Sequence, residues 1–216
     1  SQLGVDPNRI VAGGGSAGCV LANRLSADGK RQVLLIEAGR DHAPGQEPPD
    51  VRDSYPMAAA FNPAYHWTGL SARFAAPHGN QPEPAAPRFM EQARVIGGGS
   101  SINAQMANRG APEDYDGWAA MGAEGWGWDD VLPYFRKLER DMDFDGPFHG
   151  KDGPLPVRRI FPDKWPGYAN AAAAAFKSKG HQYREDQNAE FEDGYFPITI
   201  SNLYDRRVSA AIAYLT

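Results

Sequence analysis

The clearest pattern of apolar and polar positions lies in residues 9–39. A short apolar run precedes a glycine-rich turn, an amphipathic stretch follows from Ala17 to Ala27, and four consecutive apolar residues then run from Val33 to Ile36. A continuous apolar run is typical of a parallel strand that is buried on both faces. In the amphipathic stretch the apolar side chains recur at helical spacing. The pattern therefore predicts a strand, a helix and a second, parallel strand.

The turn after the first strand carries Gly13, Gly15 and Gly18 in G-x-G-x-x-G spacing. In a dinucleotide-binding βαβ unit the first glycine allows the tight turn, the second lets the backbone approach a pyrophosphate, and the third lets the helix pack closely on the sheet. The helix N-terminus then offers free N–H groups to the phosphates. Glu37 ends the second strand, about 20 residues further on, where an acid accepts hydrogen bonds from a ribose. A plain glycine-rich turn does not explain that acid, so the run predicts a dinucleotide site.

A second glycine-rich element lies at residues 94–110. Three consecutive glycines, at 97–99, precede Ser100 and Ser101, and either serine suits the N-cap of a helix. We expect the N-terminus of this helix to meet a pyrophosphate from the side opposite the first loop, with Arg94 adding a charge-assisted contact.

These motifs, with those that follow them, resemble the glucose–methanol–choline oxidoreductases. The matching runs are Gly13 to Gly18, Glu37 to Gly39, Gly97 to Asn103, Asn108 to Asp116, Trp126 to Phe135 and Arg207 to Ala211. Within the family the chain is most similar to bacterial alcohol oxidases of the 5-hydroxymethylfurfural oxidase type, on residues 186–189 and 193–197. The resemblance implies an α/β fold, with a Rossmann-like FAD-binding domain and the start of an α+β substrate domain.

The resemblance also implies a site for FAD. The residues that match the family's cofactor contacts are Gly13, Gly15, Ser16, Ala17, Glu37, Ala38, Trp67, Arg94, Gly98, Gly99, Asn103, Ala104 and Met106. Some members attach FAD through a histidine just before the asparagine, but Ile102 stands there and has no nucleophile, which implies non-covalent FAD. Arg40 could instead bind the 2′-phosphate of NADP. The second glycine element favours FAD.

No catalytic residue is assigned within the chain. Alcohol oxidation by a flavin needs a base for the hydroxyl proton while the hydride goes to the flavin, and the family supplies it with a histidine far downstream. None of the five histidines matches that motif; they are His42, His66, His78, His149 and His181. His66, beside Trp67, is the one we expect nearest the flavin, although an ordinary loop histidine is the simpler interpretation. No spacing predicts a metal site.

The implied function is that of an FAD-dependent oxidoreductase acting on the CH–OH group of primary alcohols, with oxygen or another compound as electron acceptor. The alternatives are an FAD-containing hydroxynitrile lyase of the same fold, a non-catalytic nucleotide-binding fragment and an NAD-linked Rossmann dehydrogenase. We expect residues 1–155 to be the N-terminal part of the FAD-binding domain, including flavin-covering loops. Residues 156–216 would be the start of the substrate domain and a return segment. The remainder of the enzyme, or a complementary chain, would complete the fold.

Composition limits the classes of protein to which the chain can belong. The 216 residues carry 22 basic and 27 acidic side chains, without a basic stripe for nucleic acid or the roughly 20 apolar residues of a membrane span. The lone cysteine cannot form an internal disulfide and no signal-peptide pattern opens the chain, so we expect a cytoplasmic protein. Abundant glycine and proline predict irregular connections at 42–56 and 77–87.

Two further helices are predicted downstream. Asp130 suits the N-cap of a helix that runs to Arg140 and places Pro133 in its first turn. A second helix is expected from Tyr168 to Lys179, with Gly180 as its stop.

Overall fold

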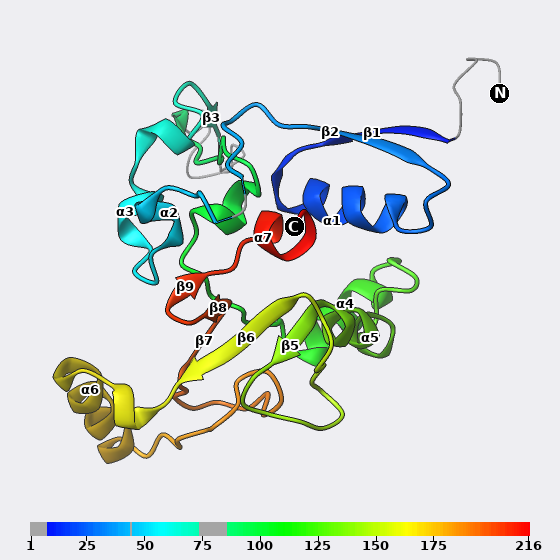
Figure 1. Ribbon diagram of the computed structural model, residues 1–216. Helices are drawn as coiled ribbons and strands as arrows, with labels where there is room; N and C mark the ends of the chain where they lie inside the picture. The colour runs from blue at the N-terminus through cyan, green and yellow to red at the C-terminus, as the bar shows by residue number, and fades with distance from the viewer. Residues whose placement is uncertain (1–7, 44, 74–85) are drawn as a thin grey trace. The chain divides into compact units, whose positions relative to one another are not determined.

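The computed structural model describes residues 8–43, 45–73 and 86–216, and the chain divides into two compact units (Figure 1). The first unit consists of Ser1–Ala104 and Ser209–Thr216, and the second of Gln105–Val208. The chain therefore leaves the first unit after Ala104 and returns to it at Ser209. The predicted boundary between the FAD-binding part, residues 1–155, and the start of the substrate domain, residues 156–216, concerns function rather than compactness. It stays a prediction.

The first unit begins with the expected strand–helix–strand motif. Its elements are β1 (Arg9–Gly13), α1 (Gly15–Ser26) and β2 (Gln32–Ile36), and the two strands pair in parallel. The helix begins two residues earlier than the apolar pattern indicated. A Cβ at Gly18 would overlap the carbonyl oxygen of Gly13, which explains why only glycine allows α1 to pack so close to β1.

The β1–β2 pair is covered on one face by α1 (Figure 1). Ala12 is buried, but Val11, Leu34 and Ile36 are 66%, 59% and 55% exposed. The prediction of a strand buried on both faces is therefore wrong for the described part of the chain. Parallel strands with continuous apolar runs normally have cover on both sides, and the described residues provide it on one side only.

The rest of the first unit is built from short elements around a small apolar core. The elements are α2 (Pro49–Arg52), α3 (Met57–Ala60), η1 (Pro63–Tyr65), the antiparallel pair β3 (Ser71–Ala72) and β4 (Arg88–Phe89), η2 (Gly98–Ser101) and α7 (Ala210–Tyr214). The core contains Val51, Ala59, Tyr65, Val95 and Ile102. The predicted connection at 42–56 contains α2, and most of the one at 77–87 lies outside the described residues.

The returning segment is fixed to the beginning of the chain. Helix α7 packs against α1, and the Asn23 side chain donates a hydrogen bond of 2.9 Å to the carbonyl oxygen of Tyr214. The Ser209 hydroxyl caps α7 by accepting from the N–H of Ile212 at 3.4 Å. The last eight residues therefore belong to the first unit.

The second unit has a three-stranded sheet with helices at its ends. Its elements are α4 (Pro112–Ala120), α5 (Trp128–Leu138), β5 (Glu139–Asp141), β6 (Leu155–Ile160), η3 (Pro162–Lys164), α6 (Gly167–Ser178), β7 (Ile198–Ile200), β8 (Asn202–Leu203) and β9 (Arg206–Arg207). Strand β6 pairs in parallel with β5 and antiparallel with β7, while β8 and β9 form a hairpin. A helix able to cross a membrane is not found among the described residues.

The two downstream helices are both present, but one of them differs from its prediction. Helix α6 agrees within one residue at each end. Helix α5 begins at Trp128, so Asp130 is its third residue rather than its N-cap, and Pro133 lies inside the helix. The reason is a distant carboxylate, because Asp116 accepts from the N–H of Trp128 at 2.9 Å and so satisfies the helix start.

Candidate functional site

The two glycine-rich elements lie against each other in the first unit. Gly98 has a φ of +56°, and a Cβ on it would lie 2.5 Å from the Cα of Gly15. The hydroxyl of Ser16 joins the elements, since it donates to the carbonyl oxygen of Gly97 at 2.9 Å and accepts from the N–H of Ser100 at 3.1 Å. The two glycine elements therefore touch directly at Gly15 and Gly98. The expected approach of the second element to a pyrophosphate stays a prediction.

The second glycine element does not start an α-helix. Gly97, with a φ of +81°, leads into η2, which is a single 3-10 turn. The hydroxyl of Ser100 donates to the carbonyl oxygen of Gly97 at 2.6 Å and accepts from the N–H of Ala210 at 2.9 Å. Ser101 donates to the carbonyl oxygen of Ile96 at 2.7 Å. The predicted N-cap is therefore wrong, because both hydroxyls hold the turn and the returning segment in place.

Glu37 stands at the end of β2, where it faces the N-terminus of α1. One carboxylate oxygen accepts from the N–H of Gly15 at 3.0 Å and the other from the N–H of Gly39 at 2.9 Å. A Cβ on Gly14 would overlap the same carboxylate, so Gly14 is needed for this approach. An ionised carboxylate has about four acceptor positions, so Glu37 keeps capacity for the hydroxyl groups of a ribose.

Three further predicted residues meet beside this carboxylate. The Nε of Arg94 donates to the carbonyl oxygen of Ala38 at 3.2 Å, and its guanidinium carbon lies 5.1 Å from the ring centroid of Trp67. A Cβ on Gly39 would overlap the backbone of Arg94, so the chain after β2 runs directly alongside the segment before the second glycine element. The structure thus joins the two predicted cofactor segments at a second point.

The remaining predicted residues follow η2 along the chain. Asn103 and Ala104 are exposed at the end of the first unit, and Met106, 53% exposed, begins the second. Between them Gln105 is buried with a φ of +62°. Ile102 is buried in the apolar core, and its alkyl side chain has no nucleophile.

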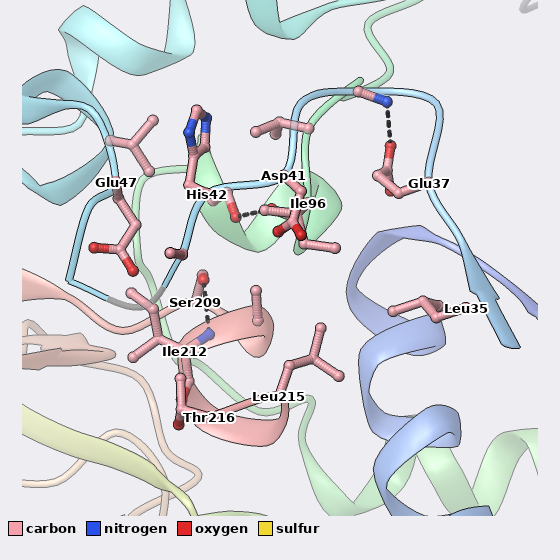
Figure 2. A pocket seen from close by; sticks show the side chains of 16 residues that line it. Leu35, Glu37, Asp41, His42, Glu47, Ile96, Ser209, Ile212, Leu215 and Thr216 are labelled. Atoms are coloured by element: carbon pink, nitrogen blue, oxygen red, sulfur yellow. Dashed lines mark hydrogen bonds between the residues drawn. The ribbon is translucent and has the colours of Figure 1, made fainter. Parts of the chain in front are cut away.

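A cavity of about 430 Å³ lies beside Glu37 in the first unit (Figure 2). Leu35 and Glu37 line one side of it, and Ile212 and Leu215 of the returning segment line another. The Nε2 atom of His42, which also lines the cavity, is buried and has no hydrogen-bond partner among the described residues. Sequence analysis did not place the cavity-lining residues of the returning segment beside Glu37, since nothing in their spacing relates them to it. They are Ser209, Ala211, Ile212, Leu215 and Thr216.

The histidine expected nearest a flavin is fixed within its own loop. The Nε2 atom of His66 lies 2.8 Å from the carbonyl oxygen of Ala60, and its Nδ1 atom is buried. The prediction about its place relative to a flavin stays a prediction. His78 lies outside the described residues, and His181 is exposed.

The comparison with protein families gives one match for nearly the whole chain. Residues 8–216 match the family described as GMC oxidoreductase. The chain belongs to this family. It is 44% identical over 209 residues to a 5-(hydroxymethyl)furfural oxidase from Methylovorus sp. (strain MP688), a match that covers 95% of this chain and 39% of that protein. It is 39% identical over 211 residues to an oxygen-dependent choline dehydrogenase from Rhizobium etli, covering 95% of this chain and 36% of that protein.

Solved structures give the same result for this GMC oxidoreductase chain. Pyridoxine 4-oxidase from Mesorbium loti matches with a TM-score of 0.78 and 34% identity, over 98% of this chain and 40% of that one. An FAD-dependent oxidoreductase from Chaetomium thermophilum matches with a TM-score of 0.78 and 29% identity, over 97% of this chain and 36% of that one. The chain thus spans less than half the length of these relatives. The predicted family, the α/β FAD-binding fold and FAD as cofactor are confirmed.

Proposed function

We propose that this chain is the cofactor-binding part of an oxidoreductase that passes a hydride from the CH–OH group of a primary alcohol to non-covalently bound FAD. The observation that carries the proposal is the junction at Ser16, which joins two glycine-rich elements next to the Glu37 carboxylate. Bound FAD would supply the hydride acceptor.

The residues of the first unit fit the parts of FAD in order. Among the described residues, no atom beyond the local backbone lies within 4 Å of the Cβ position of Gly13, Gly15 or Gly99, so the backbone there is open to a pyrophosphate. The Gly15 N–H is already donated to Glu37, which leaves the phosphates to Ser16, Ala17 and the residues after them in the first turn of α1. Glu37 and Ala38 would hold the adenosine ribose.

The flavin end of the cofactor would lie along the second element. Arg94 and Trp67 form one contact surface by their cation–π pair, and Gly98 and Gly99 lead to Asn103, Ala104 and Met106. The buried alkyl side chain of Ile102 cannot bond to a flavin, so the cofactor would be held by non-covalent contacts alone.

The substrate and the acceptor follow from the relatives. One relative is an oxidase of 5-(hydroxymethyl)furfural, whose hydroxymethyl group is a primary alcohol, and another is an oxygen-dependent dehydrogenase. A small primary alcohol and oxygen, or another electron acceptor, are therefore the proposed reactants. The base that removes the hydroxyl proton would come from outside this chain. The lyase and the non-catalytic fragment have no observation in their favour.

The test uses the full-length protein. We expect a yellow protein whose flavin is released into the supernatant by acid or hot methanol, and whose visible band bleaches anaerobically with furanic, benzylic or aliphatic primary alcohols. Flavin that stays in the pellet would contradict the non-covalent attachment. A protein that binds flavin but cleaves a hydroxynitrile, without bleaching by any alcohol, would instead be a lyase.

A further inference from the structure

A cluster of buried charges lies in the second unit and contains none of the residues matched to the cofactor. It contains three carboxylates, two guanidinium groups and one imidazole, which belong to Glu139, Asp141, Asp186, Arg109, Arg159 and His149. None of these side chains is more than 8% exposed. We call this group the His149 cluster.

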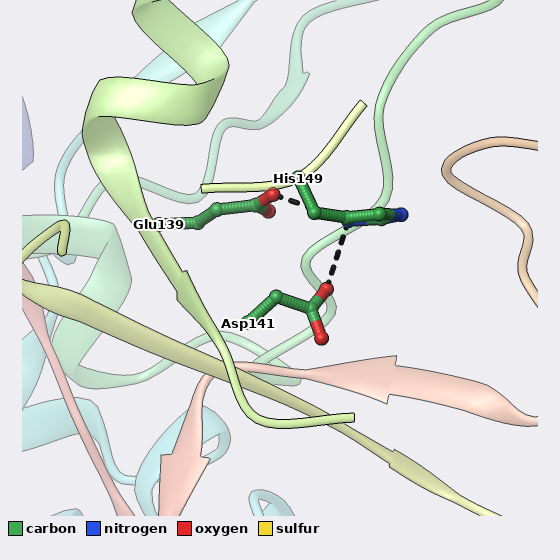
Figure 3. A group of neighbouring side chains, drawn as sticks. All are labelled: Glu139, Asp141 and His149. Atoms are coloured by element: carbon green, nitrogen blue, oxygen red, sulfur yellow. Dashed lines mark hydrogen bonds and ion pairs between the residues drawn. The ribbon is translucent and has the colours of Figure 1, made fainter. Parts of the chain in front are cut away.

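Both ring nitrogens of His149 face carboxylates. Its Nδ1 atom lies 3.2 Å from a carboxylate oxygen of Glu139 and 3.0 Å from one of Asp141 (Figure 3). Its Nε2 atom lies 2.6 Å from a carboxylate oxygen of Asp186. A neutral imidazole has one N–H and one lone pair, so one nitrogen would point a lone pair at an anion. Burial by itself raises the pKa of Asp141 and of Asp186, but the hydrogen bonds to His149 and the interaction with Arg159 outweigh it and lower both pKa values. With these carboxylates ionised on both sides of the ring, the geometry fits a proton on each nitrogen.

The charges of the cluster balance only with that second proton. Arg109 pairs with Glu139 at 2.5 Å, and Arg159 pairs with both aspartates. These two cations leave one carboxylate charge without a partner, and an unpaired buried charge is costly. Burial by itself would lower the pKa of His149, but the hydrogen bonds to Asp141, Asp186 and Glu139 outweigh it and raise the pKa to about 10.

A metal ion is the obvious alternative occupant. Ligand atoms of Glu139, Asp141 and His149 all lie within 4.8 Å of one another. A metal would need a deprotonated ring nitrogen, and a divalent ion in place of the proton would leave the cluster with an excess positive charge beside Arg109 and Arg159. The existing pairing therefore fits a proton better than a metal.

The cluster holds the segment that leads out of the second glycine element. The fully buried Asn188 connects the two, since its N–H donates to Asp186 at 3.1 Å. Its side-chain oxygen accepts from the N–H of Arg109 at 3.0 Å, and its side-chain nitrogen donates to the carbonyl oxygen of Ala107 at 2.9 Å. The guanidinium of Arg109 also donates to the carbonyl oxygen of Phe148 at 2.6 Å.

The same segment is bound on its other side by β7 and β8. The N–H of Ala107 donates to the carbonyl oxygen of Thr199 at 3.0 Å, and Met106 forms a bridge with Ile200. The left-handed conformation of Gln105 persists only where its surroundings impose it. Segment 105–109 is thus fixed from both sides.

We propose that His149 is a positioning residue: as a buried imidazolium it completes the cluster that fixes segment 105–109, and so sets the position of Met106. The link to the reaction rests on the proposed function, which places Met106 beside the flavin. His149 itself touches neither flavin nor substrate in this proposal.

The test compares three variants of the full-length enzyme. His149→Gln removes the cation and leaves the cluster with an excess negative charge. The double variant His149→Gln/Asp186→Asn restores the balance and keeps an oxygen that accepts from Arg159 and Asn188. His181→Gln changes an exposed histidine of the same unit and is the matched control. The readouts are flavin content, the visible band of the flavin, the rate of anaerobic flavin reduction at saturating furfuryl alcohol, and the thermal midpoint.

We expect His149→Gln to shift the visible band of the flavin and to slow its reduction by alcohol about 10- to 100-fold. A small displacement of Met106 from its contact with the flavin would have an effect of this size. The double variant should recover most of the rate, and His181→Gln should match the wild type. A lower thermal midpoint with an unchanged band and rate would overturn the positioning role. So would a double variant no better than the single one.

Two measurements on the wild type remain decisive if the variants do not fold. Nitrogen-15 NMR should show both ring nitrogens of His149 protonated at pH 7.5, and one unprotonated nitrogen would overturn the proposal. Elemental analysis that finds one divalent metal per chain, removable by a chelator with loss of structure, would overturn it as well. A wild-type protein without flavin would instead refute the proposed function, and the positioning of Met106 would fall with it.

Discussion

Gly98 and Gly15 touch through their backbones, because a Cβ on Gly98 would lie only 2.5 Å from the Cα of Gly15. Gly98 also has a left-handed φ of +56°, which a side chain disfavours. We expect Gly98→Ala to destabilise the full-length enzyme by at least about 1–3 kcal/mol and to lower its flavin content. Urea unfolding and flavin absorbance measure the two effects. Gly69→Ala is the control, since no described atom lies within 4 Å of its Cβ position and it is not one of the proposed cofactor residues. Equal stability of the two variants would mean that the contact between Gly98 and Gly15 adjusts to a side chain without loss of stability.

The role of Glu37 in FAD binding can be tested against that of another acidic residue, Glu47, which lines the same cavity. Glu37→Gln would turn an amide N–H₂ toward the N–H of either Gly15 or Gly39, and it loses charge-assisted bonds worth about 1.5–3 kcal/mol each. We expect FAD to bind at least about tenfold more weakly, measured by titration of the apoprotein. Glu47 lines the same cavity but makes no hydrogen bond to Gly15 or Gly39, so the Glu47→Gln variant should bind FAD normally. Normal affinity in both variants would limit Glu37 to a structural role.

The Ser16 hydroxyl makes two bonds across the junction, to Gly97 and from Ser100. Ser16→Ala should therefore cost about 1–3 kcal/mol of the free energy of unfolding and release flavin more readily. Ser26→Ala, on the same helix, breaks only bonds to its own helix and should be close to neutral. If both alanine variants unfold at the same urea concentration, the two bonds of Ser16 contribute nothing measurable to the free energy of unfolding.

The His149 cluster predicts a pH dependence of stability. The folded-state pKa of about 10 lies above the ordinary value of 6.5, so the stabilisation is complete below pH 6.5 and is lost as pH rises toward 10. Between pH 7 and 9 this group should reduce the free energy of unfolding by as much as about 1.4 kcal/mol per pH unit. The measurement is urea unfolding of the full-length protein at several pH values. The His149→Gln variant should lack this slope, and parallel curves would show that His149 does not gain a proton on folding.

The open apolar face of β1 and β2 predicts how residues 1–216 behave by themselves. Val11, Leu34 and Ile36 are each more than half exposed, and an apolar patch on a sheet promotes association. We expect the isolated chain to aggregate and Leu34→Lys to reduce light scattering several-fold. Tyr134→Lys, at an exposed position on α5, should leave the aggregation unchanged. A monomeric, stable isolated chain would contradict this prediction.

The local parts of the fold could be predicted from the sequence. The strand–helix–strand motif and α6 depend on apolar spacing and on glycines that act on adjacent turns, so Gly18 and Gly180 could be interpreted correctly. The start of α5 could not, because its first N–H is satisfied by Asp116, twelve residues earlier. Asp130 takes part as well, but from the third helical position, where it accepts from the N–H of Gly127 at 3.2 Å. The contact with Asp116 comes from outside the helix, so the sequence of the helix does not reveal it.

Contacts between residues far apart in the sequence also explain which roles sequence analysis did not find at the site. Ser100 looks like a helix N-cap, but its hydroxyl is occupied by the N–H of Ala210, 110 residues further along the chain. The His149 cluster draws its charges from residues between 109 and 186, and no regular spacing relates them. Sequence motifs identified the glycines at the two close backbone contacts, Gly18 and Gly98, while the contacts of polar side chains between distant segments became visible only in the structure.

The return of the chain at Ser209 has a consequence for the order of folding during synthesis. The bond between Asn23 and Tyr214 joins residues 191 positions apart. At the usual rate of about 5–20 residues per second, a ribosome needs roughly 10–40 seconds to make the α7 partner after α1 has been made. The contact between α1 and α7 therefore cannot form until the whole second unit has been translated, and α1 waits for its C-terminal partner during that time.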